Sequence, residues 1–251
     1  MHVIDTARDL SSEVYDQYFT VVPATNPELV DAAHALRYQV YCMEHGFFDP
    51  ALFADGREID RYDAHSVHAV LISRASTAVV GCVRLVLPQP DTGVSDFPIY
   101  ELLDAASRAR LEQCDPGRTA EISRYAVSKT LRRREGEELY PDVSQDLEAF
   151  PDVRRLAPHL SVGLLRGVAI LAAEQGITTL CAAMAPALLR LLKRFGLQFE
   201  PLGAPIEYHG LRQPCLSDCE TLLAGIAQQR SDYYTLVDAA YRSAQNRSRT
   251  S

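Results

Sequence analysis

The chain has 251 residues, of which 47% are hydrophobic, enough to bury the core of one large domain. Its formal net charge of −8 argues against a general nucleic-acid binder. No apolar run approaches the roughly 18 residues that a membrane helix requires, and the N-terminus lacks the apolar segment of a signal peptide. We therefore expect a cytoplasmic globular protein with no integral membrane segment.

The first part of the chain predicts a strand at 18–22, a helix from Asn26 to Gly46, and two further strands at 68–73 and 79–87. Asn26 supplies an N-cap, and Pro27 suits the first helical position. The apolar positions of this helix recur at three- and four-residue spacing: Leu29, Ala32, Ala33, Leu36, Val40 and Met43. That spacing places Arg37 and Tyr41 together on the flank of the apolar stripe.

An aromatic segment, 47–53, follows this helix. It is too apolar for a fully solvated loop, so it either packs on the core or forms the lid of an apolar binding site. The polar turn at 74–77 then joins the two later strands as an antiparallel hairpin. Residues 88–118 hold four prolines and one short helical piece near 99–111.

Residues 119–127 form a strand pattern that carries Glu121 and Arg124 in a segment otherwise suited to a core. Buried charges need partners. Strand residues three apart point to opposite faces, so these two would meet only across a bulge, and we expect each to pair with a charge from elsewhere. The acidic segment 58–63 and Arg84, which apolar residues flank, can supply those charges.

The rest of the chain predicts βαβ units: a helix at 158–174, a strand at 177–184, a helix at 187–195, strands at 197–201 and 206–216, and one or two helices in 218–245. A hairpin followed by βαβ units predicts an α/β fold with a mixed sheet. We expect 1–251 to form a single domain, with a charged insertion at about 129–158 and a helical C-terminal extension from about 218.

The six cysteines lie mostly in apolar segments, as reduced buried thiols do. A metal site at His209, Cys215 and Cys219 is an alternative, but their spacing matches no zinc-finger or zinc-ribbon pattern. We therefore predict no metal.

In order and spacing, the charged residues between about 30 and 130 resemble the acyl-homoserine-lactone synthase family, a branch of the GNAT-like acyltransferases. That pattern combines an arginine and aromatics in and after the first long helix with E-x-D-x-x-D, V-x-G-x-x-R-L and E-x-x-R. The matching residues are Arg37, Tyr41, Phe47, Glu58, Asp60, Asp63, Arg84, Glu121 and Arg124. Phe47 stands where the family has tryptophan. The resemblance implies a GNAT-like fold, a three-layer α-β-α sandwich.

Later segments resemble other relatives. The 129–158 connection and the tail beyond 200 have no counterpart in the signal synthases, and they resemble the long-chain N-acyl amino acid synthases and the acyltransferases associated with bacterial exosortase systems. The late I-E-Y-H-G-x-R-x-P of that second group looks like residues 206–214. The resemblance implies an N-acyltransferase that moves a long acyl chain to the amine of an amino acid or related small molecule. The alternatives are a homoserine-lactone synthase using S-adenosylmethionine and, from another class, a non-catalytic acyl-binding module.

Such an enzyme must deprotonate an amine and stabilise an oxyanion, without a covalent nucleophile. Glu121 is the candidate general base, and a purely structural carboxylate is the alternative. We group it with Arg124 and Arg84, which we expect mainly to hold the acidic cluster in an ion-pair network. The substrate-binding candidates are Arg37, Tyr41, Phe47, Glu58, Asp60 and Asp63.

The predicted donor is acyl carrier protein rather than coenzyme A. Residues 161–167 are a poor version of the glycine-rich turn that binds the coenzyme pyrophosphate. Arg132, Arg133 and Arg134 belong to a basic run that suits an acidic carrier protein, with a plain solvated charge run as the alternative. We expect no cofactor beyond the acyl-thioester co-substrate.

Overall fold

The computed structural model describes residues 16–129 and 153–248. Within these residues the strands form a mixed sheet in the order β1-β2-β3-β4-β5-β8-β6, and β7 pairs with β8. The strands are β1 Phe19–Pro23, β2 Ser66–Ser73, β3 Val79–Val86, β4 Thr119–Val127, β5 Thr179–Met184, β6 Glu200–Pro201, β7 Ile206–Glu207 and β8 Leu211–Asp218. β4 and β5 run parallel, whereas each other pair is antiparallel.

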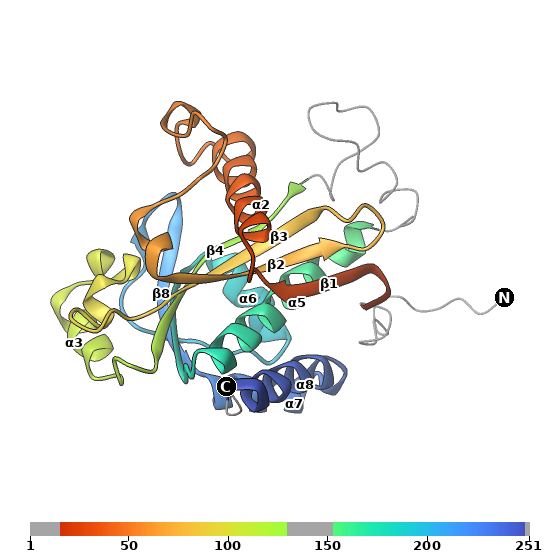
Figure 1. The fold of residues 1–251 in the computed structure, drawn as a ribbon. Coiled ribbons are helices and arrows are strands. Elements are labelled where there is room, and N and C mark those ends of the chain that lie inside the picture. Colours follow the sequence, from red (N-terminus) through yellow and green to blue (C-terminus); the bar gives the residue numbers. More distant parts are fainter. Residues whose placement is uncertain (1–15, 130–152, 249–251) are drawn as a thin grey trace.

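Helices cover both faces of the sheet (Figure 1). Helix α2, Pro27–Tyr38, packs on one face against β2, β3 and β4. The long helix α5, Val153–Glu174, lies on the other face, with α7, Cys219–Gln229, and α8, Ser231–Ser248, beyond it. The larger hydrophobic core lies on this α5 side, and a smaller one lies under α2. The predicted α/β fold and three-layer arrangement are confirmed.

Helix α5 approaches the sheet closely because glycine occupies the contact. A Cβ on Gly167 would lie 2.8 Å from Cβ of Ala69 and 3.0 Å from Cγ1 of Val21, nearer than side-chain atoms pack.

Helix α5 begins at Val153, five residues before the predicted start. Of the predicted insertion at 129–158, residues 130–152 lie outside the described residues, and 153–158 belong to helix α5. The single-domain organisation stays a prediction.

The first helix begins as predicted, since the side chain of Asn26 accepts a hydrogen bond from the Leu29 amide at 2.8 Å. After Tyr38 it continues as a π-helix, Gln39–Glu44. The wider turn changes the helical phase, so that Cys42 is buried and Met43, predicted on the apolar stripe, is 46% exposed. Arg37, predicted on the flank of this stripe, has a fully buried side chain.

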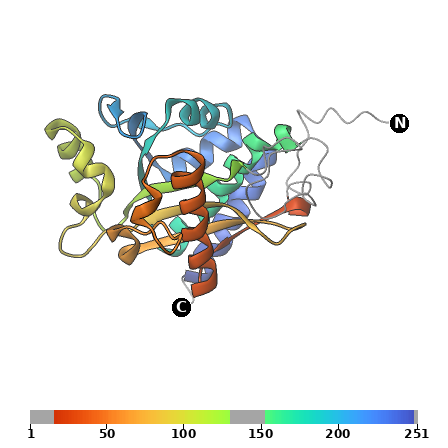
Figure 2. The same cartoon turned by 90° about the horizontal axis from the view of Figure 1, so that it is seen from above.

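Two predicted boundaries differ in the middle and late parts of the chain. The 88–118 region folds into 3₁₀ turns and a later helix, α3 Ala105–Glu112, because the Asp104 side chain caps it at the Ser107 amide. This region stands out at one side of the molecule in both views (Figure 2). The single strand predicted at 206–216 is a hairpin of β7 and β8, which His209 and Gly210 turn with φ of +50° and +92°.

The sheet splays open between β4 and β5. Their parallel pairing covers only Thr119–Glu121 with Thr179–Cys181, although β4 continues to Val127 and β5 to Met184. Beyond Glu121 the two strands therefore diverge. Helix α6, Pro186–Arg194, follows β5 at the open end.

Candidate active site

A buried ion-pair network connects α2 to the segment that precedes β2. The guanidinium of Arg37 donates from Nε to Oε2 of Glu58 at 2.6 Å and from both Nη atoms to the Asp63 carboxylate at 2.6 and 2.9 Å. Paired N–H groups of this kind match both oxygens of a carboxylate. Arg37 thus bridges two of the three acids of the E-x-D-x-x-D motif.

Arg84 and Arg124 complete this network from β3 and β4. Arg84 donates to Asp60 at 2.6 Å, to Asp63 at 3.0 Å and to the hydroxyl of Ser123 at 3.0 Å. Arg124 donates to Glu58 at 2.9 Å and to Asp60 at 2.7 Å. Three guanidiniums and three carboxylates therefore balance in charge, as predicted for the acidic cluster.

The network keeps its acids ionised. Burial alone would raise the pKa of Glu58, but the guanidiniums of Arg124 and Arg37 outweigh it and hold that pKa below its ordinary value. Burial would also raise the pKa values of Asp60 and Asp63. Arg84 and Arg124 outweigh it at Asp60, and His34, Arg37 and Arg84 outweigh it at Asp63, so both pKa values are lowered. At neutral pH these six side chains are thus fully paired ions.

A bulge in β4 brings Arg124 to the α2 face. Cys82 pairs with Ala126 and Arg84 with Ser123, so Arg124 and its successor Tyr125 together oppose one residue of β3. Arg124 has a left-handed φ of +49°, which is uncommon for a residue with a Cβ. The bulge therefore puts Glu121 and Arg124 on the same face, where regular alternation would separate them.

Glu121 is not part of this network. Its side chain is 3% exposed, and its Oε2 accepts a hydrogen bond from the Ile99 amide at 2.8 Å. Burial raises the pKa of Glu121 to about 8, against smaller lowering effects of the Ile99 hydrogen bond, Arg84 and Arg124. The prediction that it pairs with a charge is therefore wrong: a backbone amide holds it, and it is mostly protonated at neutral pH.

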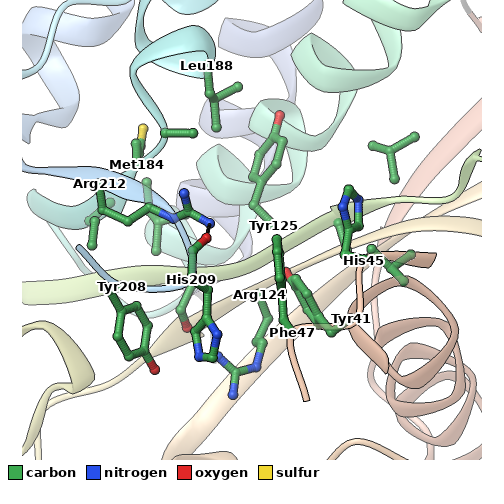
Figure 3. Close-up of a pocket in the computed structure, with 18 of the residues that line it drawn as sticks. Tyr41, His45, Phe47, Arg124, Tyr125, Met184, Leu188, Tyr208, His209 and Arg212 are labelled. Atoms are coloured by element: carbon green, nitrogen blue, oxygen red, sulfur yellow. Dashed lines mark hydrogen bonds between the residues drawn. The ribbon is translucent and has the colours of Figure 1, made fainter. Parts of the chain in front are cut away.

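A cavity of about 670 Å³ occupies the splay between β4 and β5, and Glu121 and Arg124 both line it. Its apolar wall comes from β4, β5, α5 and α6: Ile122, Leu165, Met184, Leu188, Leu191 and Leu192. Its more polar end is formed by side chains from three regions of the chain (Figure 3): Tyr41 and His45, Arg124 and Tyr125, and Tyr208, His209 and Arg212. The volume is that of an ordinary small-molecule site.

Aromatic side chains of the segment after the π-helix form one side of the pocket. Phe47 stacks on Tyr41 with 6.2 Å between ring centroids, and the Arg124 guanidinium lies 5.4 Å from the centroid of the Phe48 ring. Leu52, by contrast, is 73% exposed. Of the two interpretations of the 47–53 segment, the position of its phenylalanines favours the cover of a binding site.

Three further pocket residues lie outside the predicted active site: Tyr208, His209 and Arg212. They come from the β7–β8 hairpin, which reaches the aromatic segment, since the His209 ring lies 5.0 Å from Phe48 and 5.6 Å from Phe47 between centroids. The signal for them is the I-E-Y-H-G-L-R run at 206–212, which contains all three.

Potential metal ligands do not form a convincing site in the described part of the chain. His34, Asp63 and His68 have ligand atoms within 4.8 Å of one another, but the Asp63 carboxylate is already bonded to Arg37 and Arg84. Cys215 and Cys219 are buried and donate to the carbonyls of Ala182 and Ile177, and they do not group with His209.

Two further predictions concern carrier docking and membrane association. Arg132, Arg133 and Arg134 fall outside the described residues. Among residues 16–129 and 153–248, no helix is long and apolar enough to cross a membrane.

Comparisons with known proteins support the fold. The family described as acetyltransferase (GNAT) domain matches residues 36–141. No curated protein matches the chain. The acyl-homoserine-lactone synthase LasI has a similar structure, with 18% identity, a TM-score of 0.55, and coverage of 83% of this chain and 96% of LasI.

Two further solved structures carry the same fold. FeeM, an N-acyl amino acid synthase from uncultured soil microbes, is 18% identical with a TM-score of 0.52, over 84% of this chain and 96% of FeeM. BjaI, a CoA-dependent acyl-homoserine-lactone synthase solved with SAM and isopentyl-CoA, is 20% identical with a TM-score of 0.54, over 88% of this chain and 99% of BjaI. The protein therefore has the GNAT-like fold that these acyl-homoserine-lactone and N-acyl amino acid synthases share, as its charged motifs predict.

Proposed function

We propose that this protein is an N-acyltransferase that moves a long acyl chain from an acyl carrier protein to the amine of an amino acid or related small molecule. The observation that carries this proposal is Glu121, a buried carboxyl with a pKa of about 8 in the wall of a 670 Å³ cavity. A carboxyl whose pKa lies near neutrality is suited to proton transfer.

The proposed reaction joins an amine to a thioester. The amine nitrogen attacks the carbonyl carbon, and the carboxylate form of Glu121, directly or through water, takes the proton that the nitrogen loses. The tetrahedral oxyanion then collapses, the carbon–sulfur bond breaks, and the carrier leaves as a thiol once its sulfur is protonated. The products are an amide and a free carrier thiol, so the reaction needs the thioester as co-substrate and no covalent enzyme intermediate.

The two parts of the pocket fit this reaction. Its apolar wall, with Ile122, Met184 and Leu188, suits an acyl chain, while Glu121 lies where the strands begin to separate. The ion-pair network beside it would fix β4 in place, so we assign Arg84 and Arg124 to positioning rather than to proton transfer.

The decisive experiment replaces Glu121 with glutamine. Glu121→Gln keeps an oxygen that can accept from the Ile99 amide but removes the base, so turnover should fall by about a hundredfold or more. Purified protein is incubated with acyl carrier protein thioester and an amino-acid mixture, and amides are quantified by mass spectrometry. Glu200→Gln, an exposed glutamate outside the pocket, is the matched control and should act like wild type.

Each contrary outcome identifies a different alternative. Near wild-type turnover in Glu121→Gln would make Glu121 a structural carboxylate. Formation of an acyl-homoserine lactone from S-adenosylmethionine, in preference to acylated amino acids, would identify a signal synthase. Acyl-chain binding with no transfer to any amine would indicate a non-catalytic module.

The carrier protein is the part of the proposal that the basic run supports. If Arg132, Arg133 and Arg134 help to dock an acidic carrier, reversing all three to glutamate should raise KM for the carrier thioester at low salt. The difference should shrink as ionic strength rises, because salt screens exposed charges. An unchanged KM, or a wild-type preference for acetyl-coenzyme A, would contradict this assignment.

A further inference from the structure

Arg212 extends from β8 into the polar end of the pocket, toward Tyr125 (Figure 3). Its guanidinium lies 5.9 Å from the centroid of the Phe47 ring. It is therefore placed where a molecule in the pocket would meet it.

The guanidinium is held in a fixed direction by the hairpin itself. Nη2 donates to the carbonyl of His209 at 2.6 Å, and Nη1 donates to the carbonyl of Leu211 at 3.1 Å. The hairpin is tightened by the left-handed His209 and by a hydrogen bond from the Tyr208 amide to the Gly210 carbonyl at 2.9 Å. A guanidinium has five N–H groups, so three remain for a ligand.

The charges around the pocket leave Arg212 uncompensated. Arg124 is paired with Glu58 and Asp60, and Glu121 is mostly protonated at neutral pH. Burial and the neighbouring Arg212 and Arg124 lower the pKa of His209, which disfavours the charged form of this ring. Within the described residues, Arg212 makes no ion pair with a carboxylate, unlike the three arginines of the network. Lys129, which also lines the pocket, donates its ammonium to the Glu44 carbonyl at 2.9 Å. Arg212 thus presents to the pocket an oriented guanidinium without a carboxylate partner.

We infer that Arg212 binds the carboxylate of the acceptor, and that the acceptor is an α-amino carboxylate rather than a simple amine. This inference rests on the proposed function and names its substrate class. A carboxylate can accept two parallel N–H groups of a guanidinium and carries the opposite charge. A neutral amide or an alcohol lacks that charge. The same chemistry could also bind a phosphate of the acyl donor, so the test must separate acceptor from donor.

The test compares one amino acid with its carboxamide as acceptors, at a fixed concentration of the same acyl thioester. Wild type should favour the amino acid in kcat/KM by roughly ten- to a hundredfold, the usual worth of a hydrogen-bonded charge. In Arg212→Gln this ratio should fall toward one, while KM for the donor stays the same. Arg212→Lys, which keeps the charge but not the fork, should restore part of the preference.

Arg110→Gln is the matched control. Arg110 also donates to two backbone carbonyls, those of Pro201 and Leu202 at 3.0 and 3.1 Å, but it lies outside the pocket. It should retain the wild-type ratio. Because the ratio of two acceptors does not depend on the amount of folded enzyme, it remains informative if Arg212→Gln is less stable.

The outcomes separate this inference from the proposed function. An unchanged acid-to-amide ratio in Arg212→Gln overturns the inference, and so does a rise in donor KM, which would place a donor phosphate at Arg212. Transfer to amines without any preference for a carboxylate would overturn it too, but leave the N-acyltransferase intact. The absence of transfer to every amine would instead overturn the proposed function.

Discussion

Glu58 and Glu121 are both buried glutamates, 1% and 3% exposed, yet they lie in opposite electrostatic environments. Glu58 accepts from two guanidiniums in the ion-pair network, and its pKa is lowered. Glu121 accepts from one backbone amide beside the cavity, and its pKa is raised to about 8. The partner of a buried carboxyl, rather than its depth, decides whether it is charged.

This difference separates the roles of the two regions. In the network each charge is compensated. The network can therefore stabilise the packing of α2 on the sheet, but its side chains have little capacity for proton transfer. In the pocket the carboxyl is held with less compensation, which costs stability and leaves a group that can exchange a proton. The E-x-x-R motif thus joins the two regions, because Glu121 belongs to the pocket whereas Arg124 belongs to the network and also lines the pocket.

The largest effect should follow from breaking the network. Arg37→Met removes a fully buried cation and leaves Glu58 and Asp63 each short of one partner. Since such loss leaves an uncompensated buried charge, the free energy of unfolding should fall by roughly 3–5 kcal/mol. Urea denaturation at pH 7 measures this. A loss below about 1 kcal/mol, typical of exposed pairs, would show that water or rearrangement replaces the missing charge.

A smaller, pH-dependent effect should follow from neutralising the pocket carboxyl. The folded-state pKa of Glu121, about 8, lies above its ordinary value of 4.5, so its stabilising contribution is complete below pH 4.5 and is lost as pH rises through 8. Glu121→Gln has no such titration. Its stability relative to wild type should therefore rise between pH 6 and pH 9.

Denaturation of both proteins across this range measures the change. If the free energies of unfolding of wild type and Glu121→Gln changed in parallel with pH, this would contradict the raised pKa, whatever the effect of the substitution on activity. Glu200→Gln, on the surface, should run parallel to wild type.

The smallest effect should come from an ion pair with good geometry but no burial. Arg57 donates to both oxygens of Asp31 at 2.7 and 2.8 Å, with side chains 35% and 56% exposed. Arg57→Ala should cost about 0.2–1 kcal/mol, and less in high salt, because water and ions screen the pair. A cost comparable to that of Arg37→Met would mean that geometry, and not burial, governs the network.

Much of the network was predictable because it depends on residue identity and order. Glu58, Asp60, Asp63, Arg84 and Arg124 are charges in segments otherwise suited to a core, and such charges must be compensated on folding. The β-strand at 119–127 and the hairpin before it followed from alternation and turn composition.

Other features depend on backbone conformations that residue patterns do not specify. Arginine at φ +49° and histidine at φ +50° are exceptions to the usual preference for glycine, so the β4 bulge and the β7–β8 turn could not be predicted at those residues. The π-helix likewise shifts the phase of an otherwise regular apolar repeat, so Met43 lies off the buried stripe that the repeat predicts. The hydrogen bond from the Ile99 amide to Glu121 is a tertiary contact that the apolar periodicity of the sequence does not indicate, so the sequence predicts a charged partner instead.

The short β4–β5 ladder has a mechanical consequence. Only three residue pairs, from Thr119–Thr179 to Glu121–Cys181, join β4 to β5. The two halves of the sheet, β1 to β4 and β5 to β6, are therefore connected at one end, which can act as a hinge at the closed end of the cavity. A small rotation about that hinge displaces Val127 and Met184, at the far ends of β4 and β5, far more than it displaces Glu121 at the axis. The open end of the cavity can therefore widen for substrates of different size while the Glu121 carboxyl keeps its position.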